Sequence, residues 1–487
     1  MKSERTDVIV VGGGSAAFEA AVAARQNGAE RVVMLEKAPE SEFGGNARFS
    51  HTGFRFCHRG AEEIREFIPQ VPEAEFRRMH IPPYTAEQFM ADLKRVTQER
   101  IDSFLAELLV KESNAGVHWM RELGIKWEPE RYVTIDGRHY FEPGMVVHPA
   151  GGVEGGLGQL MQWREIAARL GVEIRFESRV CALHGNDRKV EGVRVSAAAG
   201  EYDLVGAAVI LCSGGFQASP EMRARYLGPN ADLMKVRGSK HDTGEVLQMA
   251  LALGAKAAGH WQGAHATPID ARSPEVEISA KANRYSYVYG ITVNSLGQRF
   301  FDEGEARSAY TYAKTGWAVL RQPGAIAYQI FDRKAFGLFH PGYRFAEPVE
   351  AGTIPELAEK IGIELALLTH TVEAFNKAVR ADIPFDPTRL DGKCTAGIAP
   401  PKSNWAVPID EPPFRAYRVT GGITFTFGGL QIDGDARVLN TGLRPIRGLY
   451  ASGDIVGLFF HNYPSCSGQT RNVVFSRLAA KHAARSA

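Results

Sequence analysis

The chain has few cysteines, no long hydrophobic run and no excess of charge of either sign. Its 487 residues include 5 widely spaced cysteines and no Cys-x-x-Cys pair, which gives no support to a zinc ribbon, a cysteine-ligated iron–sulfur cluster or c-type haem attachment. Sparse, odd-numbered cysteines are typical of reduced thiols, so we expect a cytoplasmic protein. The 57 basic residues nearly balance the 56 acidic ones, which argues against a dedicated nucleic-acid binder.

The sequence also lacks targeting signals. Its N-terminal segment has neither the basic start nor the long apolar stretch of a secretory signal, and no window of about 18 apolar residues predicts a transmembrane segment. We therefore expect that, if the protein works at a membrane, it does so through a partner or a surface contact. Hydrophobic residues make up 44% of the chain, which is enough for a sizeable core.

The first 36 residues predict a strand, a turn, a helix and a second strand. The β-branched run 8–11 is typical of a buried parallel strand. Residues 16–27 are rich in alanine and predict a helix, with Gly28 at its C-terminal cap. Residues 31–36 predict the second strand, which ends at Glu36.

The turn between this strand and helix has the spacing Gly12-x-Gly14-x-x-Ala17. Gly12 permits a tight turn, Gly14 lets the backbone approach a pyrophosphate, and Ala17 allows close packing of helix and strand. The N–H groups at the start of the helix favour phosphate, and Glu36 can accept hydrogen bonds from ribose hydroxyls. The sequence therefore predicts a dinucleotide site; the alternative is a glycine-rich turn that only packs a helix.

Two further segments favour FAD over NAD. Gly44-Gly45-Asn46 follows the second strand, where small residues can lie against the ribityl and isoalloxazine groups. Near the C-terminus, a predicted strand runs into Gly453-Asp454, and this acid can accept from a polyol such as ribityl. The alternative for the second segment is an ordinary turn at the end of a strand.

The composition changes twice along the chain. Aromatic residues and histidines become dense from about residue 259, and a glycine-rich, strand-like style returns from about 425. We interpret this as an FAD-binding domain over residues 1–258 and 423–487, interrupted by a capping and substrate domain over 259–422.

Several segments of the sequence resemble the FAD-binding fumarate reductase and succinate dehydrogenase flavoprotein superfamily, over essentially the whole chain. Within it, the chain is most similar to the tricarballylate dehydrogenase branch and distantly similar to 3-ketosteroid dehydrogenases. The segments are Gly12–Ala17, Gly44–Asn46, 301–305 with 310–314, 423–429, and 461–464 with 467–470.

The resemblance implies an α/β fold, in which a Rossmann-like FAD-binding domain with a βαβ unit, a mixed sheet and a β-meander is interrupted by an inserted α+β capping domain. Residues 467–470 would open the last helix and direct its N–H groups at the flavin O2/N1 region. His51 does not match the spacing of family members with covalent FAD, so we expect non-covalent FAD. The further expected FAD contacts are Ser15, Ala16, Lys37, Gly53, Val180, Ser213, Gly214, Gly215, Asp242, Ser467, Gly468, Gln469 and Thr470.

A flavin that interconverts C–C and C=C bonds needs a proton carrier from the protein. By resemblance, Arg307 is the proton donor or acceptor, with help from Glu303. Arginine is normally protonated, so this role requires a dry site and a relay with a carboxylate. The alternative is that Arg307 only binds a substrate carboxylate through two hydrogen bonds.

The resemblance places a substrate-binding histidine at His265; the alternative is a packing histidine beside Trp261. Two positions depart from the fumarate reductases, because Phe425 replaces a second substrate histidine and Ser465 replaces an arginine that clamps a carboxylate. We therefore expect a different way of holding substrate. The expected substrate-side residues are Thr424, His461, Tyr463 and Arg471.

Of these, Arg471 would replace the lost cation, unless it faces solvent in the first turn of the last helix. These residues predict an FAD-dependent dehydrogenase that introduces a C=C bond next to a carboxylate of a small polycarboxylate, with tricarballylate to cis-aconitate as the type reaction. The resemblance implies that a separate membrane redox protein or quinone reoxidises the flavin.

Two alternatives stay open. The first is an FAD-dependent desaturase of a cyclic or steroid-like ketone, for which a tyrosine would activate the carbonyl. The second is a flavoprotein with a redox-sensing or assembly role and no substrate. The candidate tyrosines for the ketone reaction are Tyr285, Tyr287, Tyr289, Tyr310, Tyr312 and Tyr463.

Overall fold

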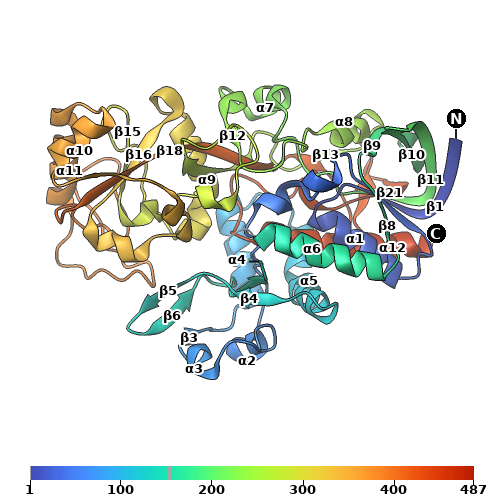
Figure 1. Cartoon of the computed structure of the whole chain (residues 1–487), viewed down its shortest axis with the longest axis horizontal. Coiled ribbons are helices and arrows are strands. Elements are labelled where there is room, and N and C mark those ends of the chain that lie inside the picture. The colour runs from blue at the N-terminus through green and yellow to red at the C-terminus, as the bar shows by residue number, and fades with distance from the viewer. Residues whose placement is uncertain (1, 152–154, 487) are drawn as a thin grey trace. The chain divides into compact units, whose positions relative to one another are not determined.

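The computed structural model describes residues 2–151 and 155–486 and forms two compact units (Figure 1). The first unit contains the residues up to 232, residues 238–265 and the residues from 424 onward. The second unit contains residues 233–237 and 266–423. The chain thus leaves the first unit and returns to it for its last segment.

An eight-stranded mixed sheet forms the centre of the first unit. Strand β1 lies between β2 and β11 and runs parallel to both, while β9, β10 and β11 form an antiparallel meander. Val8–Val11 in β1 are all buried, as a strand covered on both faces requires. The strands are β1 (Lys2–Val11), β2 (Val32–Leu35), β8 (Glu173–Arg175), β9 (Arg179–Asn186), β10 (Lys189–Ala197), β11 (Gly200–Leu211), β20 (Arg437–Leu439) and β21 (Pro445–Ala451).

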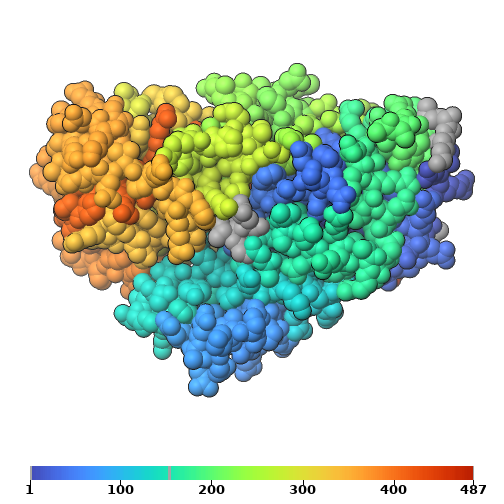
Figure 2. All heavy atoms as spheres, viewed as in Figure 1, coloured from blue at the N-terminus to red at the C-terminus, as the bar shows by residue number. Residues whose placement is uncertain are grey.

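Helix α1 (Ser15–Gln26) follows β1 directly, so the predicted strand–turn–helix–strand order is confirmed. It packs against α12 (Ser467–Ser486) and α6 (Gly155–Arg169) (Figure 1). Helix α6 lies at the surface of this unit (Figure 2), where it buries Leu160 and exposes Met161. These packed helices cover the sheet beside the glycine turn that opens α1.

Most of the remaining helices of the first unit lie between residues 61 and 122. The remaining helices are α2 (Ala61–Arg65), α3 (Glu73–Phe76), α4 (Ala86–Thr97), α5 (Ser103–Glu122), α7 (Pro220–Leu227) and α8 (Glu245–Ala252). The short strands of this unit are β3 (Met79–His80), β4 (Trp127–Pro129), β5 (Tyr132–Ile135), β6 (Arg138–Phe141), β7 (Val147–Pro149), β13 (Ala257–Ala258) and β19 (Gly429–Leu430).

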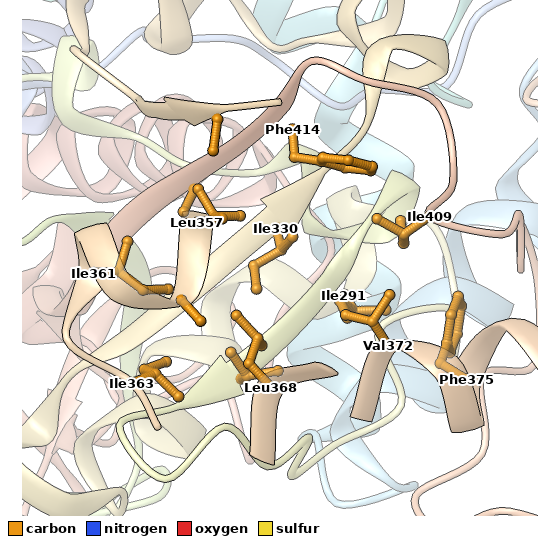
Figure 3. Packing of buried hydrophobic residues seen from close by; sticks show 14 of the residues in the cluster. Ile291, Ile330, Leu357, Ile361, Ile363, Leu368, Val372, Phe375, Ile409 and Phe414 are labelled. Carbon is orange, nitrogen blue, oxygen red and sulfur yellow. The ribbon is translucent and has the colours of Figure 1, made fainter. Parts of the chain in front are cut away.

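The second unit is built on a six-stranded sheet in which β18 pairs with β12, β14, β16 and β17. Aliphatic side chains of the sheet and of helices α10 and α11 form its core (Figure 3), including Ile291, Ile330, Leu357 and Leu368. Its elements are β12 (Lys235–Val236), β14 (Ala264–Asp270), β15 (Ile291–Asn294), α9 (Ser308–Leu320), β16 (Ala327–Phe331), β17 (Val349–Ala351), α10 (Ile354–Ile361), α11 (Leu365–Ala378) and β18 (Phe414–Thr426), of which β14 and β18 continue into the first unit.

Candidate active site

The turn between β1 and α1 is so tight that it requires glycine. Gly12 has a φ of +127°, and a Cβ there would lie 2.3 Å from the carbonyl oxygen of Cys212. A Cβ on Gly13 would lie 2.2 Å from Oε2 of Glu36. The backbone of the turn therefore packs directly on the residues that follow β11 and β2.

The start of α1 fits an anionic ligand. Its N-cap is Gly14, which provides no side-chain acceptor, and its first turn contains no acidic residue. The first N–H groups of a helix need an acceptor, and the helix dipole favours a negative one. Ser15 Oγ donates to Gln469 Oε1 at 3.2 Å and accepts from Asn472 Nδ2 at 3.2 Å, so the beginnings of α1 and α12 are tied together.

Glu36 lies at the end of β2 with its carboxylate buried. Its Oε1 accepts from the backbone N–H of Ala38 at 2.7 Å, and its Oε2 faces Gly13. Burial raises the pKa of Glu36, although His241 and Lys37 oppose this. A buried acceptor beside the glycine turn fits the ribose hydroxyls of a dinucleotide.

We expect Glu36→Ala to weaken FAD retention about tenfold or more, because it removes a hydrogen-bonding partner that carries charge. The measurement is the flavin-to-protein ratio after gel filtration. Glu40→Ala is the matched control, because the Glu40 side chain is 58% exposed and pairs with Arg164. Full flavin occupancy in the Glu36 variant would remove this residue from the ribose site.

The side-chain amide of Asn46 ties the predicted Gly44–Asn46 loop to two other segments of the chain. Asn46 Nδ2 donates to the carbonyl of Thr424, and Asn46 Oδ1 accepts from the backbone N–H of Ser239 at 2.9 Å. Gly44 has a φ of +116°, which favours glycine. The Asn46 amide thus joins three segments of the first unit, and the predicted residues Asn46 and Thr424 meet each other.

The predicted start of the last helix at Ser467 is confirmed. A Cβ on Gly468 would lie 3.8 Å from the ring of Tyr463 and 4.0 Å from the ring of Phe425. Two of the residues singled out in the sequence therefore flank the first turn of α12.

His265 belongs to a buried group of rings, which we call the aromatic cluster: His265, Phe425, Phe427, Phe459 and Tyr463. The ring of His265 stacks on Phe425 with centroids 5.2 Å apart and lies 5.3 Å from the ring of Tyr463. Phe459 could not be picked out from the sequence, because no motif marks it and two of its ring partners, Phe425 and Phe427, lie in a distant segment.

Arg471 is buried against this cluster and does not face solvent. One of its guanidinium nitrogens donates to Oδ1 of Asp454, and the guanidinium lies 5.6 Å from the ring centre of Phe425 and 5.3 Å from that of Phe459. Two predicted residues, the acid expected at the ribityl chain and the cation expected at the substrate, therefore form an ion pair.

Three further positions named from the sequence are His461, Ser465 and Val180; the first two form backbone hydrogen bonds and the third is buried. His461 donates its backbone N–H to Nδ1 of His260 at 3.1 Å, and burial lowers the pKa of His260. The carbonyl of Ser465 accepts from Nε of the fully buried Arg55 at 2.9 Å. Val180 is a buried residue near the start of β9.

The expected proton carrier lies in the second unit. Arg307 immediately precedes α9, and its guanidinium donates to the carbonyl of Thr388. Glu303 pairs with Arg299 at 2.5 Å and accepts from the backbone N–H of Thr292 at 2.8 Å. The Glu303 carboxylate is thus bound by Arg299 and by a backbone N–H, and its expected help to Arg307 stays a prediction.

Among the candidate tyrosines, the ring of Tyr285 lies 4.7 Å from that of Tyr312 and 4.9 Å from that of His340, all in the second unit. Tyr287 is buried and its hydroxyl lies 2.6 Å from Thr311 Oγ1.

Within residues 2–151 and 155–486, no group of His, Cys, Asp and Glu is arranged to hold a metal ion. Each helix in that part of the chain is too short or too polar to cross a membrane.

Comparisons with known proteins agree with these features. A family described as "FAD binding domain" matches residues 7–470. The chain is 30% identical to a probable fumarate reductase, Ifc3, of Shewanella frigidimarina, over 100% of this chain and 76% of that protein. It is 24% identical to a vinyl phenol reductase of Lactiplantibacillus plantarum, over 99% of this chain and 97% of that protein.

The solved structure of a flavocytochrome c3 fumarate reductase in its open conformation resembles the chain with a TM-score of 0.73. The two are 28% identical, and the match covers 100% of this chain and 79% of that one. The predicted fold class, a Rossmann-like FAD-binding domain with a capping domain, is confirmed.

Proposed function

The chain belongs to the FAD binding domain family and is an FAD-dependent oxidoreductase, and we propose that it forms or reduces a C=C bond next to a carboxylate or carbonyl of a small substrate. The observation that carries this proposal is that Phe425 and Tyr463 lie beside the first turn of α12 and that His265 packs on both rings, in the unit that contains the glycine turn between β1 and α1.

FAD, when bound, supplies the hydride chemistry at N5. The protein has to polarise the substrate and move a proton. We assign polarisation to His265, and the N–H groups at the start of α12 to the stabilisation of negative charge. Arg307 would donate or accept the proton, and the second unit would act as the capping domain that carries it.

For the substrate, the first candidate is a small polycarboxylate, converted as tricarballylate is to cis-aconitate. It is supported by the potential cations His265, His461 and Arg307, and by the replacement of two fumarate-binding residues by Phe425 and Ser465. A separate redox protein or quinone would then reoxidise the flavin, in a cytoplasmic enzyme.

A second candidate, a flat or cyclic compound with one carbonyl or carboxylate, is favoured by the aromatic cluster. The charge of Arg471 is committed to Asp454, and the rings of Phe425 and Tyr463 beside α12 are suited to an uncharged planar group. The vinyl phenol reductase among the relatives has a flat, ring-bearing compound in its name, although that compound has no carbonyl or carboxylate.

Turnover with an artificial electron acceptor distinguishes the two candidates. We expect activity with one of two panels, either di- and tricarboxylates or cyclic ketones and ring-bearing acids, compared as kcat/KM. Activity with neither panel, by an enzyme that holds FAD, would contradict the proposed reaction.

Phe425→His tests how the site holds substrate. We expect the variant to gain fumarate reduction about tenfold over the wild type, because a new hydrogen-bond donor would face the substrate carboxylate. Phe425→Leu is the control, because it removes the ring without adding a donor. Equal fumarate activity in both variants would show that residue 425 does not face the substrate carboxylate.

A further inference from the structure

Three acids lie near the glycine loops of the first unit: Glu36 and Asp242, which are buried, and Asp454, which is partly exposed. Glu36 accepts from a backbone N–H, and Asp454 is paired with Arg471. The Asp242 carboxyl group differs from that of Asp454 because its partner is a neutral side-chain amide and not a cation. Its Oδ2 accepts from Nε2 of Gln217 at 2.9 Å.

The other oxygen of Asp242 faces the FAD loops. Oδ1 lies 2.7 Å from the position that a Cβ would take on Gly214, and 3.8 Å from that position on Gly45. Gly214 has a φ of +73° and Gly45 a φ of +52°, so both loops bend back at the points where they meet this carboxyl group. Only 7% of Asp242 is exposed, and its Oδ1 faces two glycines that are among the expected FAD contacts.

The cations around Asp242 are engaged by other groups. Lys37, which follows β2, donates to Thr243 Oγ1 at 2.8 Å and lies 3.5 Å from Glu245. His241, the residue before Asp242, lies 2.8 Å from Glu42. With Arg471 of α12 paired to Asp454, no cation forms an ion pair with Asp242 in the described part of the chain.

An ionised carboxylate buried without a cation is costly, so a group in this position holds its proton. Burial, with Asp454 and Glu36 adding to it, raises the pKa of Asp242 to about 8. Ionisation would also add a third negative charge to the loops that receive the pyrophosphate of FAD.

We propose that Asp242 meets the cofactor as a neutral carboxylic acid whose Oδ1 hydroxyl donates a hydrogen bond to an acceptor atom of FAD, so that loss of this proton weakens FAD binding. The proposal rests on the FAD site but not on the substrate. It is therefore tested by FAD affinity and can fail while the proposed reaction stands.

The direction in which FAD affinity changes with pH follows from the coupling between FAD binding and protonation of Asp242. If bound FAD favours the protonated acid, the pKa of Asp242 is higher in the complex than in the FAD-free protein, and binding takes up a proton at a pH between the two values. The affinity is then full below about pH 8 and falls by up to about tenfold per pH unit above it.

The experiment titrates FAD into the deflavinated full-length protein between pH 6 and 9 by calorimetry, in buffers of different ionisation enthalpy. We expect proton uptake that is absent at pH 6 and grows toward one proton by pH 9. Asp242→Asn keeps a donor at every pH, so its FAD affinity should stay flat across this range. Asp382→Asn is the control, because Asp382 is exposed and paired with Arg380.

Three results would overturn the proposal. Proton release on FAD binding, or affinity that rises with pH, would mean that Asp242 accepts a hydrogen bond as a carboxylate. A wild-type affinity that does not change with pH would mean that its proton is not linked to FAD. Should Asp242→Asn fail to fold, the wild-type calorimetry alone still decides between these outcomes.

Discussion

Arg307→Ala is expected to lower kcat by about 10³-fold, because it removes the group that moves the substrate proton. FAD content should not change, because Arg307 belongs to the second unit and the FAD loops belong to the first. Single-turnover and steady-state kinetics of the purified yellow protein measure this effect. Arg307→Lys keeps the charge but loses the planar donor geometry, and we expect it to recover only a small part of the rate.

The control for this experiment is Arg333→Ala. Arg333 lies in the same unit, its side chain is 65% exposed, and it pairs with Glu411. It should turn over like the wild type. If Arg307→Ala kept near-wild-type kcat and only raised KM, Arg307 would bind the substrate without moving a proton.

Gly12→Ala should abolish FAD retention and lower the Tm by several degrees. The φ of +127° is unfavourable for alanine, and the new Cβ would lie 2.3 Å from a carbonyl oxygen of the backbone, which cannot move aside as a flexible side chain can. The turn would have to open, and the start of α1 would shift away from the phosphate position. Thermal unfolding and the flavin-to-protein ratio measure the two effects.

Gly28→Ala is the control that separates the effect of backbone strain from the effect of the contact between a new Cβ and the Cys212 carbonyl. Gly28 also has a positive φ, of +101°, but a Cβ there would meet nothing within 4 Å. We expect this variant to lose about 1 kcal/mol of stability and to keep its FAD. FAD loss of the same size in both variants would mean that strain alone, and not contact with Cys212, accounts for the effect.

The FAD-binding part of the fold could be predicted because its signals are local. The β-branched run at 8–11, the glycine spacing after it and the alanine-rich segment that follows lie within one stretch of chain, and the structure has β1 and α1 there. The start of α12 at Ser467 was predictable for the same reason, since a polar, glycine-containing segment precedes an apolar one.

The contacts that decide the role of each site residue could not be predicted in this way. Arg471 and Asp454 stand in separate motifs, and nothing in their spacing shows that burial joins them as an ion pair. The resemblance gives Glu303 a role beside Arg307, and no motif predicts the ion pair that Glu303 forms with Arg299 in the structure. Such pairings depend on the direction and burial of the side chains in the folded protein, and a sequence motif gives neither.

Whether the bound flavin forms and reduces C=C bonds is tested by mixing the FAD-loaded enzyme anaerobically with saturated carboxylic acids and ketones and recording the visible absorbance of the flavin. We expect at least one of these compounds to bleach the flavin, with one C=C bond formed per FAD. The corresponding unsaturated product should restore the colour. A purified protein without flavin, or a flavin that no compound of either class reduces and no unsaturated acid or ketone reoxidises, would contradict this expectation.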